Sequence, residues 1–280
     1  MKKLLEKAIP KLYGFYFNFI HLFSKEKGAR IALDVFSIPR RSKVLEHQKE
    51  FLSTARTQQI AFEDGLFMLY HWKGSGPTVL LNHGWESNSF RWKYLIEPLQ
   101  KLDYNIICID APAHGNSDGT LFTAVKYSRI IKATIDLYQP EIIVAHSVGA
   151  MATIFQESSN RHDCIKKIVL LGSPNKLEVI MQGYQSLTGF NNSVYNSLNK
   201  LLKTKFGFHI EEFNTADFAK KIDTPALIVH NPNDIIVPYE AMEEIAAKMP
   251  QATTYTSQTG GHSLYTQEVI DEVITFLEES

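Results

Sequence analysis

From residue 57 onward, short apolar runs alternate with segments of helical spacing, and this alternation limits the folds open to the chain. Most of the runs are rich in β-branched residues. Continuous apolar runs of this length suit strands buried on both faces, as in a parallel sheet covered by helices. The predicted strands are 78–81, 105–109, 141–145, 168–171, 226–229 and 252–256.

A β-hairpin is expected just before this alternation. The dipeptide Asp64-Gly65 lies between the runs 57–62 and 66–72, and Asp-Gly between two such runs is a strong hairpin signal. Amphipathic helices are predicted between and after the later strands, at 122–138, 151–157, 239–248 and 266–279. A hairpin followed by repeated strand–helix units predicts a mostly parallel open sheet flanked by helices, an α/β fold.

Residues 174–222 interrupt the alternation, because they hold no convincing strand and carry aromatic residues at roughly helical spacing. An insertion between the carboxyl end of one strand and the start of the next would lie over the edge where open α/β sheets bind ligands. We therefore predict a helical cap there, with an extra helical layer that plays no part in binding as the alternative. Residues 1–54 are predicted to form an N-terminal helical extension, and residues 55–280 the main domain.

The segment 12–23 raises the question of a membrane, because it is rich in aromatic residues and follows four lysines. A bilayer core needs about 20 apolar residues, and Glu6, Pro10 and His21 interrupt any longer window. Charged residues, rather than a small-residue cleavage site, follow the segment. We therefore predict a helix packed on the protein's own body, with peripheral contact of this helix with a membrane surface as the alternative.

The charge balance argues against nucleic acid as the main partner. The chain has 29 Lys and Arg against 30 Asp and Glu, whereas nucleic-acid binders usually carry a basic excess. The two cysteines, Cys108 and Cys164, sit in or beside apolar stretches and are predicted to be buried thiols. Nothing requires an oxidising compartment, so we expect a cytoplasmic protein. No spacing of metal ligands is present, and we expect neither metal nor cofactor.

A serine stands directly after a predicted strand and at the start of a helix, within Ala145-His146-Ser147-Val148-Gly149. A serine on such a sharp turn takes a positive φ, and small residues two positions away on each side make room for it. A helix N-cap would explain Ser147 but not the small residues Ala145 and Gly149. The motif therefore indicates a nucleophile that projects above the sheet edge.

The sequence Asn82-His83-Gly84-Trp85 follows the predicted strand 78–81. In acyl transfer the attacked carbonyl becomes an oxyanion, which needs donors about 3 Å away. The backbone N–H groups of Trp85 and Val148 are placed to provide them, and Gly84 lets the main chain approach closely; a simple glycine turn is the alternative. A further loop, 110–117, ends another strand, and there we expect His114 to make a structural hydrogen bond rather than to catalyse.

An acid and a histidine each follow a later strand, Asp234 in Asn231-Pro232-Asn233-Asp234 and His262 in Gly260-Gly261-His262. Serine is a poor nucleophile without an adjacent imidazole, and the imidazole needs a carboxylate to orient it. Parallel strands bring the loops at their carboxyl ends together whatever their separation along the chain. We therefore expect Ser147, Asp234 and His262 to meet.

With these motifs, residues from about 55 to 280 resemble the α/β-hydrolase superfamily. The motifs that carry the resemblance are NHGW at 82–85, DAPAHGNS at 110–117, AHSVG at 145–149, NPNDIIVP at 231–238 and GGH at 260–262. The resemblance implies the α/β-hydrolase fold, a mostly parallel open sheet of about eight strands flanked by helices, which here would carry the predicted cap insertion. The first ~50 residues, predicted as an N-terminal helical extension, have no counterpart in the minimal fold. The resemblance also implies Ser147 as nucleophile, His262 as base and Asp234 as its partner, with Trp85 and Val148 as oxyanion donors.

The chain departs from the family pattern at two positions. Ala145 replaces the commoner glycine of the serine motif, which is a conservative change in steric terms, and Ala113 stands where many relatives have glycine. We also expect His83, Gly84 and His146, which flank the serine and the oxyanion donors, to contact the substrate.

A serine at this turn favours chemistry through an acyl-enzyme, because haloalkane dehalogenases and epoxide hydrolases of this fold use Asp there. We expect hydrolysis of a small-molecule carboxylic ester or thioester with a small or medium acyl group. The alternatives are a carbon–carbon bond hydrolase or a lipid-directed acyl hydrolase of the same fold, and a hydrolase-like binding protein without turnover. The sequence leaves the natural substrate and the oligomeric state open.

Overall fold

The computed structural model describes residues 2–62 and 65–279, with side chains from residue 8 onward. The chain divides into two compact units. The sheet unit comprises Pro39–Asn175 and Thr215–Ser280, and the helical unit comprises Met1–Ile38 and Lys176–Asn214. Residues 39–54, predicted as part of the N-terminal extension, therefore group with the sheet.

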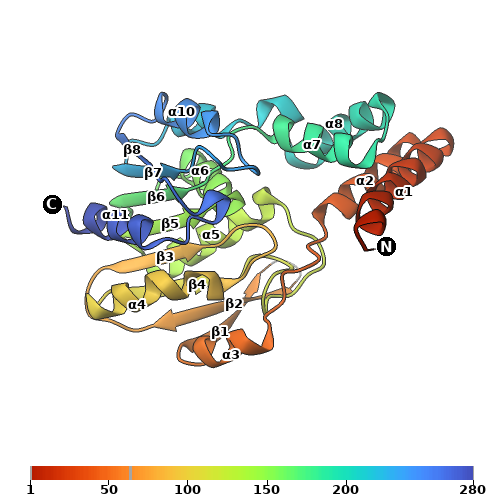
Figure 1. Ribbon diagram of the computed structural model, residues 1–280. Coiled ribbons are helices and arrows are strands. Elements are labelled where there is room, and N and C mark those ends of the chain that lie inside the picture. The colour runs from red at the N-terminus through yellow and green to blue at the C-terminus, as the bar shows by residue number, and fades with distance from the viewer. Residues whose placement is uncertain (1, 63–64, 280) are drawn as a thin grey trace. The chain divides into compact units, whose positions relative to one another are not determined.

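The described part of the sheet unit contains eight strands in the spatial order β1-β2-β4-β3-β5-β6-β7-β8 (Figure 1). β1 pairs antiparallel with β2, and β2 with β4, while all other neighbours are parallel. The strands are β1 (Arg56–Phe62), β2 (Gly65–Trp72), β3 (Thr78–Asn82), β4 (Asn105–Ile109), β5 (Ile142–His146), β6 (Lys167–Leu171), β7 (Ala226–His230) and β8 (Ala252–Thr256). The predicted mostly parallel sheet is confirmed; the turn of the hairpin, at 63–64, lies outside the described residues.

Each face of the sheet buries its own core, because successive strand residues point to opposite sides. In β3, Leu80 joins one core, whereas Val79 and Leu81 join the other. One face is covered by α5 (Ala124–Tyr138), α6 (Val148–Ser159), α9 (Thr215–Ala219) and α10 (Glu240–Ala246), and the other by α3 (Glu46–Leu52), α4 (Lys93–Lys101) and α11 (Gln267–Glu278). Since both faces are covered, the central strands need apolar residues at nearly every position, which produces the continuous runs of the sequence.

Capping side chains set the observed starts of two helices. Thr123 accepts a hydrogen bond from the N–H of Lys126, so α5 begins two residues later than predicted. Thr266 does the same for Val269 at the start of α11. Of the two cysteines, Cys108 is buried as predicted, Cys164 is half-buried, and both are free thiols.

The register aligns the carboxyl ends of the parallel strands. Asn82, the last residue of β3, lies opposite Ile109 of β4 and Ala145 of β5. Leu171, the last residue of β6, lies opposite His146 of β5 and Val229 of β7. The loops that follow β3, β4, β5, β6 and β7 therefore leave the sheet at one edge.

The helical unit consists of α1 (Lys2–Phe23), α2 (Lys25–Ser37), α7 (Leu177–Thr188) and α8 (Asn192–Phe206), with a short 3₁₀ turn at Ile210–Glu212. These helices surround a core of their own, formed by Phe17, Ala29, Ala32, Leu33, Met181, Phe190, Val194, Leu198, Leu202 and Ile210. The two segments of this unit, Met1–Ile38 and Lys176–Asn214, both contain helices, as the sequence predicts. The sequence of neither segment indicates that the two associate with each other. The role of residues 174–222 as a cap stays a prediction.

α1 packs on its own unit with one face only. Gly14, Phe17 and His21, at helical spacing, are buried, and His21 Nε2 lies 2.9 Å from Ser197 Oγ. The helix therefore packs on the protein's own body along this face, as predicted. Among the described residues, no helix combines the length and the apolar character needed to cross a bilayer.

We predict that Gly14→Ala destabilises the helical unit by about 2–3 kcal/mol, as overpacking of a tight contact does. A Cβ at Gly14 would lie 2.1 Å from the carbonyl oxygen of Thr188, and a backbone atom at the end of α7 cannot easily move away. Gly183→Ala in α7 is the matched control, because nothing apart from the neighbouring backbone of its own helix lies within 4 Å of its Cβ position. Alanine there favours the helix by up to about 1 kcal/mol. Chemical denaturation measures both variants, and equal stability would contradict the close packing of α1 on α7.

Candidate active site

Ser147 occupies a strained turn between β5 and α6. Its φ of 53° and ψ of −126° lie in a region that residues with a side chain rarely adopt. The neighbouring strand holds the turn, since the N–H of Ser147 donates to the carbonyl of Leu171 at 2.8 Å. Strain of this kind is of order 1–3 kcal/mol and clusters at functional sites.

Two glycines let the chain pack closely around Ser147. A Cβ at Gly149 would lie 2.4 Å from the carbonyl oxygen of His83, and a Cβ at Gly84 would lie 2.9 Å from Cβ of Ser147. The loop after β3 therefore lies directly against both the serine and the first turn of α6. Ala145 is fully buried in β5, so its methyl group is accommodated at the position where glycine is commoner.

The structure brings together the three residues predicted as nucleophile, acid and base. His262 Nε2 lies 3.0 Å from Ser147 Oγ, and His262 Nδ1 lies 2.7 Å from Asp234 Oδ2. His262 sits on a single 3₁₀ turn, which the chain enters through Gly260 and Gly261 with φ of 89° and 52°. With Nδ1 protonated, the imidazole donates to Asp234 and accepts from the serine hydroxyl, so one line of hydrogen bonds joins the three side chains.

Asp234 is held in its ionised form by hydrogen bonds. Its Oδ1 accepts from the N–H groups of Ile236 and Val237 at 2.8 and 3.0 Å. Its Oδ2 accepts from His262 and lies 3.4 Å from Nε2 of His230. Burial alone would raise the pKa of Asp234, but the hydrogen bonds from the two imidazoles and the backbone outweigh burial and lower the pKa well below its ordinary value.

Sequence reasoning missed two residues that support the site. His230 is fully buried at the end of β7, and its Nε2 lies 3.0 Å from the carbonyl oxygen of Val237 as well as near Asp234. A histidine that ends an apolar strand four residues before Asp234 is a weak signal for such a role.

Arg91 is the second missed residue. It is about nine-tenths buried, and its Nη2 donates to the carbonyl oxygen of Ser263 at 2.8 Å. Its guanidinium lies 4.3 Å from the ring centre of Tyr265. Burial lowers the pKa of Arg91 to about 10. The residue thus clamps the loop of His262, and no local pattern in the sequence distinguishes it from a surface arginine.

His83 and His146, predicted to contact substrate, are both buried beside the turn. His83 Nδ1 lies 2.7 Å from the carbonyl oxygen of Gly84, and its Nε2 accepts from the N–H of Ala111 at 2.9 Å. His146 Nε2 lies 2.8 Å from the carbonyl oxygen of His262. Burial lowers the pKa of His83 to about 4 and that of His146 well below its usual range, so both rings are neutral near pH 7. Contact of His83, Gly84 and His146 with substrate stays a prediction.

The two expected oxyanion donors are backbone N–H groups next to the serine. α6 begins at Val148, so the N–H of this residue has no acceptor within its helix. Across residues 2–62 and 65–279, the N–H groups of Trp85 and Val148 donate no hydrogen bond. The amino terminus of α6 adds partial positive charge beside Ser147. The role of the pair as oxyanion donors stays a prediction.

The loop 110–117 is fastened by a buried carboxylate. Asp110 accepts from the N–H and the hydroxyl of Ser89 at 2.8 and 2.7 Å and from the N–H of Asn116 at 2.8 Å. Gly115 has φ of 49°, and a Cβ there would lie 1.9 Å from Asp110 Oδ2, so only glycine fits. His114 accepts from the N–H of Glu86 at 3.1 Å, which confirms the predicted structural hydrogen bond.

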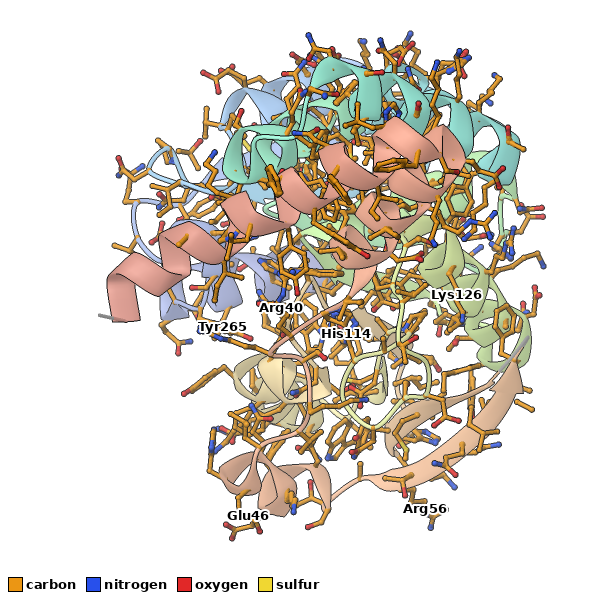
Figure 2. The ribbon with its side chains drawn as sticks, turned by 90° about the vertical axis from the view of Figure 1, so that its right-hand side faces the viewer. Arg40, Glu46, Arg56, His114, Lys126 and Tyr265 are labelled. Carbon is orange, nitrogen blue, oxygen red and sulfur yellow. The ribbon has the colours of Figure 1, made fainter. Side chains whose placement is uncertain are left out.

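Figure 2 shows His114 among the loops in the interior of the view, whereas Glu46 and Arg56 project outward at its periphery. The burial of His114 agrees with this placement, since its side chain is fully enclosed. Burial also lowers the pKa of His114 to about 3, and the imidazole therefore acts as a neutral link between loops.

Comparison with known proteins adds to this geometry. Residues 77–210 and 189–269 match the family described as alpha/beta hydrolase fold. The chain belongs to this family. The family predicted from the motifs, and the fold with it, are therefore confirmed.

Individual α/β hydrolases are similar to this chain over most of their length. A bifunctional esterase/perhydrolase of Acinetobacter calcoaceticus is 22% identical over 263 residues, which cover 75% of this chain and 94% of that protein. An esterase structure from Pyrococcus furiosus is 22% identical with a TM-score of 0.65, covering 86% of this chain and 97% of the other. A thioesterase domain from the curacin biosynthetic pathway is 18% identical with a TM-score of 0.59, covering 80% and 99%. These structures share the fold of this hydrolase.

We predict that Asp234→Asn lowers the free energy of unfolding of this α/β hydrolase more at about pH 6 than at about pH 3. A carboxylate with a lowered pKa contributes stability above the unfolded pKa of about 3.9 and loses it as the pH falls towards the folded value. The difference between wild type and variant should shrink by about 1 kcal/mol over this range, measured by denaturation at each pH.

Asp217→Asn is the control for this experiment. Asp217 also has a lowered pKa, caused by hydrogen bonds from Lys220 and Lys248, but its side chain is 47% exposed. Exposed ion pairs contribute only about 0–1 kcal/mol, so its effect should be small at either pH. A pH-independent loss in Asp234→Asn would show that the carboxylate is not held ionised by the site.

Proposed function

We propose that this protein is a serine hydrolase that cleaves a small-molecule carboxylic ester or thioester with a small or medium acyl group. The observation that carries the proposal is the hydrogen-bonded line from Asp234 through His262 to Ser147, with the serine on a strained turn. The esterase and thioesterase activities named for the similar proteins agree with it.

In the first step, the hydroxyl of Ser147 attacks the carbonyl carbon of the substrate. His262 Nε2 takes the hydroxyl proton as the new bond forms, because it already lies 3.0 Å from the oxygen. Asp234 stabilises the resulting imidazolium and keeps its ring in place. His262 then gives the proton to the departing alcohol or thiol, and an acyl group remains on Ser147.

In the second step, His262 removes a proton from water, which attacks the acyl-enzyme. The tetrahedral intermediate collapses, the acid is released and the proton returns to Ser147. In both steps the negative charge develops on the former carbonyl oxygen. We assign its stabilisation to the N–H groups of Trp85 and Val148, which are fixed before reaction and cost no reorganisation.

A binding protein without turnover is the main competing function. Such a protein would have no need for the strain of about 1–3 kcal/mol at Ser147 or for the alignment of His262 with both partners. A carbon–carbon bond hydrolase would use the same three side chains, and no contact of the described residues favours it over an ester hydrolase.

The cap predicted at residues 174–222 is part of this proposal. The assignment rests on the sequence, where an insertion between two core strands carries aromatic residues at roughly helical spacing. We give this insertion the role of acyl-chain selection. Turnover of p-nitrophenyl esters of increasing acyl length measures this role: a defined optimum supports it, and equal turnover of all lengths contradicts it.

We predict that a fluorophosphonate probe labels the wild-type protein covalently at Ser147, and that Ser147→Ala abolishes labelling. His262→Ala should reduce ester turnover by about 10³-fold or more, because the hydroxyl loses its base. Mass spectrometry of the labelled peptide locates the adduct, and a p-nitrophenyl ester assay follows turnover.

Ser263→Ala is a matched control for these variants. Ser263 adjoins His262, but its hydroxyl donates to the carbonyl of Gly260 and to none of the three central side chains. Labelling and turnover in this variant should stay within a few fold of wild type. Undiminished labelling of Ser147→Ala, or no labelling of folded wild type, would contradict the proposed nucleophile.

A further inference from the structure

α1 exposes more large apolar side chains than any other element in the described residues. Phe15, Leu22 and Phe23 are 70%, 80% and 77% exposed. The full set, called here the outer face of α1, is Ile9, Leu12, Tyr13, Phe15, Tyr16, Phe19, Leu22 and Phe23. At 100° per residue, these positions cover about half of the helix circumference. Apolar patches of this kind on a folded protein mark interaction sites.

The outer face carries no charge. From Leu12 to Phe23 the sequence contains no Lys, Arg, Asp or Glu, and its one histidine, His21, lies on the buried side of the helix. Five of the eight side chains are aromatic. Aromatic rings of this kind are enriched where a helix meets the boundary between lipid headgroups and acyl chains.

Lysines flank the outer face along the chain. Lys2, Lys3 and Lys7 precede it in the sequence, Lys11 lies between its first two members, and Lys25 and Lys27 follow it. Lys11, Lys25 and Lys27 are exposed. The helical unit as a whole has eleven Lys and Arg against six Asp and Glu, a formal charge of +5, which leaves −6 for the sheet unit. The basic charge of the protein is thus concentrated in the unit that carries the apolar face.

We propose that the outer face of α1 docks the protein on an anionic lipid bilayer. The helix lies parallel to the surface, with its aromatic and aliphatic side chains at the headgroup boundary, and the lipid phosphates attract the net positive charge of the helical unit. The partner is defined by its chemistry: an apolar layer covered by negatively charged headgroups. The proposal concerns where the protein binds and does not depend on the reaction at Ser147.

The packing of α1 leaves it free to dock without refolding. Lys11 Nζ donates to the carbonyl oxygen of Ser186 at 2.8 Å, and Asn18 Oδ1 accepts from the N–H of Asn191 at 2.9 Å. Together with the contact between His21 and Ser197, these bonds fix the buried side of the helix on its own unit. The outer face is therefore presented as a rigid surface, and little ordering is needed on binding.

A second copy of the chain is the competing occupant of this face. Pairing two outer faces would bring together two helical units of charge +5, and like charges across an interface oppose association. An anionic bilayer instead attracts the same lysines. The charge of the helical unit therefore favours lipid over self-association.

Flotation of the full-length protein with vesicles tests the proposal. One set contains phosphatidylcholine alone, and the other contains about a quarter phosphatidylglycerol. We expect the bound fraction to rise with phosphatidylglycerol and to fall when salt screens the lysines. Equal binding to both vesicle types, or no binding to either, would overturn the proposal of an anionic bilayer.

The triple variant Phe15→Gln, Leu22→Gln, Phe23→Gln removes the most exposed apolar groups of the outer face. We expect its partition onto phosphatidylglycerol vesicles to fall by about tenfold or more. The matched control replaces Leu45, Leu102 and Leu137 of the sheet unit, which are 56%, 42% and 57% exposed, by Gln. Its partition should equal that of wild type.

Circular dichroism and the thermal midpoint establish that each variant is folded, independently of any enzymatic activity. Equal loss of binding in the two triple variants would overturn the assignment to α1. Analytical ultracentrifugation tests whether a second copy of the chain occupies the outer face instead. If the wild type is a dimer that does not bind vesicles, and the α1 variant is a monomer, the outer face belongs to a second copy and the proposal is overturned.

Discussion

The shared carboxyl edge of the parallel strands is the constraint on which the rest of the structure depends. Because β3, β5 and β6 end opposite one another, the loops after them leave the sheet side by side. Ser147 and His262 are 115 residues apart in the chain, yet their side chains lie at hydrogen-bond distance. Both faces of the sheet are buried under helices, so the edge cannot shift without opening a core. The packing of the sheet therefore fixes the relative positions of the side chains in the site.

The polar residues around the serine are arranged so that only a few carry charge. Burial keeps His83, His114 and His146 neutral, and they connect loops through backbone groups. Hydrogen bonds keep Asp234 ionised against the same effect of burial. The imidazole of His262 therefore has an ionised carboxylate beside it, with Nδ1 2.7 Å from Asp234 Oδ2. Neutral supports around an ionised carboxylate suit the general base catalysis that we propose for the half-buried His262.

The two units of the protein differ in composition as much as in architecture. The sheet unit is acidic and carries the polar site, while the helical unit is basic and exposes the aromatic side of α1. In the proposals made above, the reaction belongs to the sheet unit and the docking surface to the helical unit. The separation also explains why the charge of the whole chain, −1, conceals a strong local asymmetry.

Local rules of the backbone explain what the sequence by itself determined. Buried parallel strands must be apolar at successive positions, so each strand can be predicted from a few residues. A serine with positive φ needs small neighbours, so the turn at Ser147 can be predicted in the same way. Asp234 and His262 can be picked out by another route: each lies in the loop after a strand, β7 or β8, and a serine nucleophile needs an acid and an imidazole. The helices of the two chain segments that form the helical unit also follow from the spacing of their apolar residues alone.

Tertiary structure decided the features that depend on distant neighbours. In the helical unit, Gly14 packs closely on Thr188, and Phe17 shares a core with Phe190. The sequence does not predict these pairings, because an amphipathic helix face indicates burial but not which surface buries it. His230 and Arg91 gain their roles only from the loops that fold against them. A side chain whose function lies in contacts across the fold leaves no periodic trace in the sequence, and only the packed structure reveals it.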